Sequence, residues 1–111
     1  MTKKHALRNH PIRLPLKHPP SHPGELLREI IEEHLRMAVS DAARQLRISR
    51  QTLHRILSQR AGVTPEMALR LGKFLGNGPG LWLRMQEAHD LWHAEQAMRD
   101  EVARILPADA A

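Results

Sequence analysis

The sequence predicts an all-α protein of five helices, in which the second and third helices form a helix-turn-helix. Apolar residues recur with helical spacing from residue 23 onward, and no stretch alternates as a β-strand would. Proline, glycine and capping residues divide these apolar stretches into segments of helical length. The length of 111 residues fits one domain.

The first 22 residues differ in composition from the rest of the chain. They contain four prolines, four histidines and no acidic residue, and they show no sustained apolar period. Their basic residues are Lys3, Lys4, Arg8, Arg13 and Lys17. We therefore expect residues 1–22 to form a flexible basic arm, followed by a helix-turn-helix domain over residues 23–106.

The composition excludes several classes of protein. The chain has no cysteine, which rules out disulfides and zinc sites built on thiolates. No apolar run follows the basic start as in a signal peptide, and none approaches the ~18 residues of a membrane span. Basic residues gather in the arm and between residues 39 and 60, which indicates a polyanionic partner. We expect a cytoplasmic protein without a cofactor.

The first helix is predicted over residues 23–36. Pro23 suits the first helical position, where its missing N–H is not needed. Leu27, Ile31 and Leu35 recur every four residues and form the buried face of an amphipathic helix. The opposite face carries Glu25, Glu29, Glu32 and Glu33.

The second and third helices have the spacing of a helix-turn-helix. The second is predicted over residues 39–46, and the third begins after Ser49, a favourable N-cap residue, and runs to about Ser58. Ala43 provides the small side chain that the close crossing of the two helices requires. Apolar side chains at the spacings that hold such a pair together are Leu46, Ile48, Leu53 and Ile56.

The fourth and fifth helices complete the predicted domain. Thr64-Pro65-Glu66 is a helix start, and Gly76 is a natural stop, which places the fourth helix over residues 65–75. The fifth is predicted to restart after Pro79 and to run past Trp92 toward Leu106. Because this helix outruns the small core, we expect a homodimer interface on it. The residues assigned to that interface are Leu91, Trp92 and Met98.

The third helix carries the side chains predicted to bind DNA. In a helix-turn-helix the second helix of the pair enters the major groove and reads bases from its N-terminal turns. Arg50 can form a bidentate contact to guanine, and Gln51 can do so to adenine. The full predicted set is Ser49, Arg50, Gln51, Thr52, His54, Arg55 and Arg60. A helical hairpin with a solvated basic face is the structural alternative.

Two motifs far apart in the chain support a family assignment. His-Pro-Gly-Glu-Leu-Leu stands at residues 22–27, and Leu-Trp-Leu at residues 81–83 precedes Gln86. Between them lie Ser-Arg-Gln at residues 49–51 and a matching run at residues 62–71. On these residues the chain resembles the HigA (VapI-like) family of antitoxins, within the lambda repressor/Cro-like superfamily.

The resemblance implies a lambda repressor-like domain that acts as an antitoxin. Such a protein neutralises a RelE-like toxin that cleaves mRNA, and it represses its own operon as a homodimer bound to an operator. Because an RNA-cleaving toxin is expected to be basic, we assign Glu25, Glu29 and Glu32 to the toxin contact. The family usually has glycine in the turn between the second and third helices, where Arg47 stands here. We expect Arg47 to adopt a positive φ.

The sequence is also compatible with two other functions. The first is a stand-alone repressor of the Cro type without a toxin partner. The second is a metal-dependent hydrolase, because His89 and His93 lie four residues apart and share one face of a helix. Asp90 replaces the usual glutamate of that motif and no third ligand is evident, so we expect no catalysis.

Overall fold

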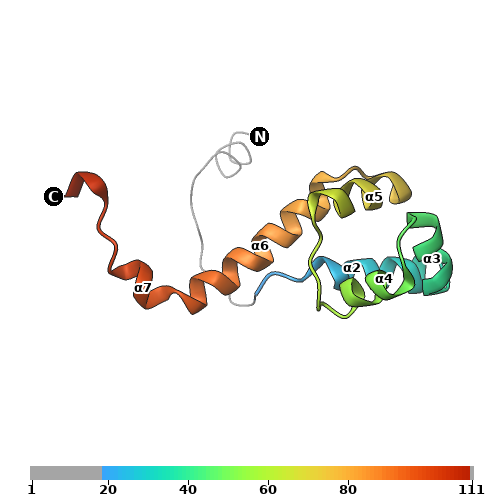
Figure 1. Ribbon diagram of the computed structural model, residues 1–111, viewed down its shortest axis with the longest axis horizontal. Coiled ribbons are helices and arrows are strands. Elements are labelled where there is room, and N and C mark those ends of the chain that lie inside the picture. The colour runs from blue at the N-terminus through green and yellow to red at the C-terminus, as the bar shows by residue number, and fades with distance from the viewer. Residues whose placement is uncertain (1–18, 111) are drawn as a thin grey trace, which may run out of the picture.

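The computed structural model describes residues 19–110 of the chain. These residues form the helices α2 to α7, which are joined by short loops (Figure 1). The helices are α2 (Pro23–Glu29), α3 (Val39–Leu46), α4 (Arg50–Leu57), α5 (Pro65–Leu75), α6 (Gly80–Ala97) and α7 (Arg99–Ala103). A π-helical turn, η1 (Ile30–His34), continues α2, and a 3-10 turn, η2 (Ala108–Ala110), lies near the C-terminus. Residues 19–110 contain no strand, so the predicted all-α class is confirmed. The predicted arm falls largely in residues 1–18, outside the described residues.

Local capping explains where the helices begin and end. The Ser49 hydroxyl accepts a hydrogen bond from the Thr52 N–H at 3.0 Å, and the Thr64 hydroxyl accepts one from the Met67 N–H at 3.2 Å. Gly76 ends α5 with φ of 78°, in the left-handed region that glycine tolerates. The boundaries predicted for α3, α4 and α5 are therefore confirmed.

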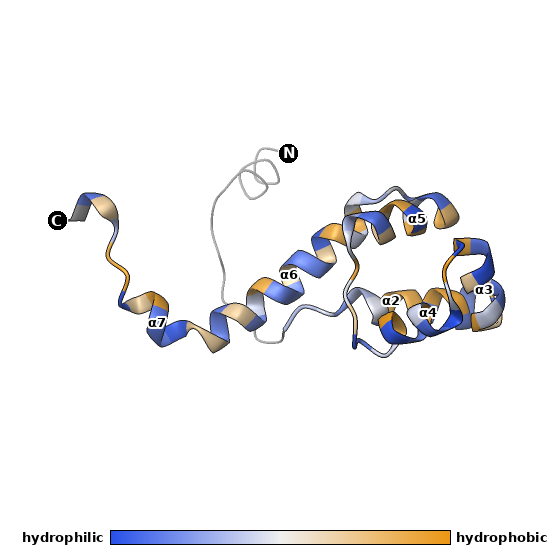
Figure 2. Cartoon of the chain, viewed as in Figure 1, coloured by the Kyte–Doolittle hydropathy of each residue, from blue (hydrophilic) through white to orange (hydrophobic). Residues whose placement is uncertain are grey.

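The core lies where α2, α3, α4 and α5 meet the first turn of α6. Figure 2 shows the hydrophobic faces of these helices turned toward one another. Trp82 is fully buried at the start of α6, and its indole N–H donates a hydrogen bond to the Asn77 side-chain oxygen at 3.3 Å. The other large apolar side chains that are at most 1% exposed in this core are Leu27, Ile31, Leu53, Ile56 and Leu71.

The helices α2 and α4 approach each other at Gly24. A Cβ atom at this position would overlap the carbonyl oxygen of Ile56, so only glycine fits without a shift of one helix. The approach brings the start of α2 against the second half of α4. It therefore holds the predicted recognition helix against the body of the domain.

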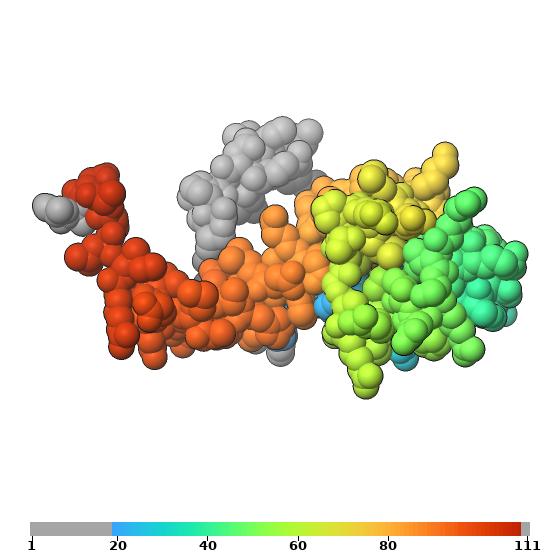
Figure 3. All heavy atoms as spheres, in the orientation of Figure 1, coloured from blue at the N-terminus to red at the C-terminus, as the bar shows by residue number. Residues whose placement is uncertain are grey.

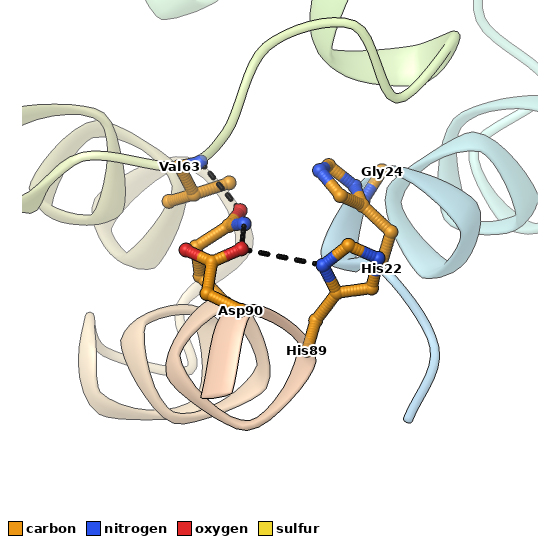
Figure 4. A network of polar contacts seen from close by, with 6 residues as sticks. His22, Gly24, Val63, His89 and Asp90 are labelled. Atoms are coloured by element: carbon orange, nitrogen blue, oxygen red, sulfur yellow. Dashed lines mark hydrogen bonds and ion pairs between the residues drawn. The ribbon is translucent and has the colours of Figure 1, made fainter. Parts of the chain in front are cut away.

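Polar contacts tie α6 to the loops around it (Figure 4). The side-chain oxygen of Gln86 accepts a hydrogen bond from the Val63 N–H at 2.7 Å, and its amide group donates to Asp90 Oδ1 at 2.9 Å. Val63 is buried, and Gln86 supplies the hydrogen-bond acceptor that its backbone N–H needs.

Two predicted helix ends are wrong. The first helix does not remain an α-helix to Arg36: it widens into η1 after Glu29, and Arg36 has φ of 49°. The fifth helix does not run unbroken to Leu106: it breaks at Met98, and α7 ends at Ala103. Pro107 disfavours a helical conformation at Leu106, the residue before it, so the helix is not expected to continue through that point.

The C-terminal part of α6 and all of α7 extend away from the core, as Figure 3 shows. Large apolar side chains along this extension are exposed, among them Leu91, Met98, Val102, Ile105 and Leu106. Within residues 19–110, no helix has the length and apolar character needed to cross a membrane.

Candidate nucleic-acid interface

The turn between α3 and α4 has the geometry predicted for it. Arg47 lies in the left-handed region, with φ of 62° and ψ of 42°, so the expectation of a positive φ is confirmed. Its N–H donates to the Arg44 carbonyl at 3.1 Å, and the Ile48 N–H donates to the Ala43 carbonyl at 3.0 Å. These bonds close the C-terminus of α3 and redirect the chain into α4.

One face of α4 is buried, and this decides which face is free. Leu53, Ile56 and Leu57 are at most 3% exposed and pack on the core. The exposed side chains of the helix are Arg50, Gln51, Thr52, His54 and Arg55. The structure thus brings the predicted base-reading side chains together on the surface of α4, as the helical spacing implied.

Ser49 and Thr52 lie together at the N-terminus of α4. Besides accepting the capping bond, the Ser49 hydroxyl donates to the Thr52 hydroxyl at 2.8 Å. Both residues are exposed, and the free N–H groups of a helix N-terminus are favourable to an anion. This end of α4 therefore has the geometry to accept a phosphate group beside the side chains predicted to read bases.

Arg60 lies beyond the C-terminus of α4. The chain reverses there through Gln59, which has φ of 65°, and the Arg60 N–H donates to the Arg55 carbonyl at 2.8 Å. The Arg60 side chain is exposed. Arg50 and Arg60 thus place positive charge at the two ends of one helix, with no acidic residue between them in the sequence.

The other predicted surfaces lie on different elements. Glu25 and Glu29 are exposed on α2, and Glu32 is exposed on η1. On the extension, the predicted interface residues differ in exposure: Leu91 is 57% exposed, Met98 is 47% exposed and Trp92 is half-buried beside His93.

His89 and His93 lie in a cluster of rings. The centroids of these two rings are 4.4 Å apart, and His22 lies 4.9 Å from His89 on the other side. In the part of the chain that the structure describes, no group of three His, Cys, Asp or Glu side chains is placed to hold a metal ion. The hydrolase alternative therefore gains no support from this geometry.

The sequence pattern assigns no role to His22 or Gln86 beyond family resemblance. His22 Nδ1 accepts a hydrogen bond from the Gly24 N–H at 2.9 Å and so caps α2. Its position directly before Pro23 was a usable signal, because proline favours the first helical position and the N-cap precedes it. The bond from Val63 to Gln86 had no such local signal.

Comparison with known proteins decides the family. No protein-family model matches the chain. Virulence-associated protein I of Dichelobacter nodosus is 37% identical over 89 residues, which are 80% of this chain and 82% of that protein. The solved structure of an addiction module antidote protein of the HigA family from Coxiella burnetii has a TM-score of 0.76 and 32% identity, covering 81% of this chain and 99% of that one. The chain belongs to the HigA family of antitoxins.

A further solved structure similar to this HigA-family chain contains DNA. It is antitoxin GraA in complex with its operator, with a TM-score of 0.75 and 38% identity, covering 86% of this chain and 97% of that one. The resemblance to HigA that the sequence motifs indicated is therefore confirmed, together with the helix-turn-helix fold.

Proposed function

We propose that this HigA-family chain is the antitoxin of a type II toxin–antitoxin module. In this proposal it binds its own operator in the cytoplasm through α4, and it neutralises a RelE-like toxin that cleaves mRNA. It acts by binding and catalyses no reaction of its own.

The exposed basic face of α4 is the observation that carries the DNA-binding proposal. Arg50, Gln51 and Arg55 lie on this face, and the neighbouring N-terminus of α4 can hold a phosphate. A helical hairpin with no DNA partner would not require these side chains and the helix N-terminus to lie on the same side of α4. The similar antitoxin GraA has been solved with its operator, which adds support from a relative.

We also propose a homodimer that uses the extension formed by α6 and α7. Two half-sites one DNA turn apart require two recognition helices. Leu91 and Met98 expose apolar surface on the extension, and Leu91 also lines an open groove of about 550 Å³ with Val63 and Leu83. Burying this surface in a second copy would remove it from water.

For the toxin, we propose contact through the glutamate face of α2 and η1. Glu25, Glu29 and Glu32 are exposed and belong to neither the proposed DNA surface nor the proposed dimer surface. A basic partner would be attracted to this face by charge complementarity.

Two experiments test the proposed function. Selection of bound duplexes from a random DNA library, followed by gel shift, is expected to yield one preferred sequence with two half-sites. Co-expression with the adjacent reading frame, followed by pull-down and growth rescue, is expected to recover a toxin. Sequence-specific DNA binding without any captured toxin would instead indicate a stand-alone repressor of the Cro type.

A further inference from the structure

A side chain from α5 reaches the turn of the helix-turn-helix. Arg70 Nη1 donates a hydrogen bond to the carbonyl oxygen of Leu46 at 2.9 Å and another to that of Arg47 at 3.2 Å. The two carbonyls belong to the C-terminus of α3 and to the residue in the left-handed conformation. We call this pair of contacts the Arg70 bridge.

The carbonyls in the Arg70 bridge need a partner for a physical reason. The last four carbonyls of a helix have no partner within the helix, and Leu46 is the last residue of α3. A non-glycine residue in the left-handed region costs roughly 1–2 kcal/mol, and Arg47 is such a residue. A charged donor at this point satisfies the helix end and holds the strained turn together.

The Arg70 side chain is itself held in place. Its Nη2 lies 3.6 Å from a Glu66 carboxylate oxygen one turn earlier on α5, and the side chain is only 34% exposed. Met67 and Leu71, which flank it on α5, are buried in the core. The guanidinium therefore ties the turn to α5, a helix that is itself packed on the core.

We propose that Arg70 is a positioning residue for DNA recognition. It holds the end of α3 and the Arg47 turn, and through them it sets where α4 begins and how Arg50 and Gln51 are presented. It acts on the protein backbone and makes no contact with DNA. The effect on DNA rests on the proposed function, whereas the effect on the turn does not.

The test compares Arg70→Met with Lys73→Met, which removes the same charge from an exposed side chain one turn later on α5. In the full chain, amide hydrogen exchange followed by NMR is expected to speed up at Ile48 in Arg70→Met, and to remain unchanged at Val63. Affinity for the selected duplex should fall by about 10-fold, in line with the loss of hydrogen bonds from a charged donor. Lys73→Met should leave both measurements near those of the unmodified chain.

Two further variants separate positioning from direct DNA contact. Arg70→Lys keeps the charge but has a single nitrogen, which cannot replace both Nη1 on the two carbonyls and Nη2 beside Glu66, so it should also loosen Ile48 and weaken binding. Adding Arg47→Gly to Arg70→Met should restore part of the affinity, because glycine adopts the left-handed turn without strain. If Arg70→Met fails to fold, Arg70→Lys is compared with Lys73→Met instead, in the same two measurements.

Other outcomes would overturn the proposal. Unchanged exchange at Ile48 in both Arg70 variants would show that the bridge does not hold the turn. A direct phosphate contact would give a different result: Arg70→Lys would bind the duplex as tightly as the unmodified chain, and the salt slope of DNA binding would fall by about one in Arg70→Met. If the unmodified chain selects no duplex, the proposed function fails, and exchange at Ile48 still decides whether Arg70 holds the turn.

Discussion

His22 and His89 pack edge to face, with ring centroids 4.9 Å apart and ring planes at 85° (Figure 4). His22 is 4% exposed and caps α2, whereas His89 comes from the middle of α6. Burial is the main cause that lowers the pKa of His22, the nearby His89 lowers it further, and Asp90 acts in the opposite direction. Protonation of His22 would also replace the acceptor that Gly24 uses with a donor.

This lowered pKa predicts that the protein is less stable in mild acid. Well above pH 6.5, the ordinary pKa of histidine, His22 is neutral in both the folded and the unfolded chain and contributes no pH dependence. As the pH falls below 6.5, the unfolded chain takes up a proton before the folded chain does, so the free energy of unfolding decreases until the pH passes the lower, folded-state pKa. His22→Asn keeps a capping oxygen but does not titrate, so its Tm should fall less between pH 7.5 and pH 5.

The control for the histidine experiment is His34→Asn, because His34 is exposed at the end of η1. It should show the same loss of Tm in acid as the unmodified chain. Equal pH sensitivity in His22→Asn and His34→Asn would mean that His22 is not the group responsible.

Base recognition is expected to depend on the first turn of α4. Arg50→Ala and Gln51→Ala should each weaken binding to the selected duplex by about 1–3 kcal/mol and relax its base preference. Arg60→Ala should weaken binding to all duplexes about equally, because a phosphate contact carries no sequence information. Gel shifts on matched and single-substituted duplexes measure both effects. No loss in the Arg50 and Gln51 double variant would contradict the placement of α4 in the groove.

Gly24→Ala is expected to destabilise the fold strongly. Alanine favours a helix over glycine by about 1 kcal/mol, but its Cβ would overlap the Ile56 carbonyl oxygen, which belongs to backbone and cannot swing away. Forcing the two helices apart should cost a net of about 2–4 kcal/mol in denaturant unfolding. Gly80→Ala is the matched control, because its Cβ would meet only the end of the flexible Arg84 side chain. Equal stability of the two variants would argue against a close crossing of α2 and α4.

The proposed homodimer should depend on the extension. Replacing Leu91 and Met98 together with glutamate should shift the protein to a monomer in sedimentation at tens of micromolar, because charge would enter an apolar interface. Leu69→Glu is the control, since Leu69 is 62% exposed on α5 and lies outside the proposed interface. An unmodified chain that sediments as a monomer, with and without DNA, would rule out the dimer.

The glutamate face and the N-terminal segment should have separate roles. Changing Glu25, Glu29 and Glu32 to glutamine should weaken capture of the toxin, while the same change at exposed Glu95 should not. Removing residues 1–18 takes away five basic residues, so the salt slope of DNA binding should shrink while toxin capture survives. A truncated chain that loses the toxin but keeps its DNA affinity would reverse these two assignments.

The sequence by itself determined the features that depend on near neighbours. Ser49 and Thr64 each cap a helix by accepting a hydrogen bond from the backbone N–H three residues later, and Gly76 ends α5. These boundaries therefore follow from local hydrogen bonding. The helix-turn-helix follows from the same kind of information, because helical spacing decides that Leu53 and Ile56 face inward while Arg50 faces out.

Only the tertiary structure decided the contacts between residues far apart in the chain. Nothing near Arg70 in the sequence shows that it bonds to Leu46, and nothing near His22 shows that it packs on His89. The break of the helix at Met98 was also not predicted. The sequence pattern around Met98 is still helical, and nothing in it marks the point where the chain has left the core. Periodicity reports which face of a helix is apolar. Which helix, carbonyl or ring meets that face depends on how all the helices pack at once.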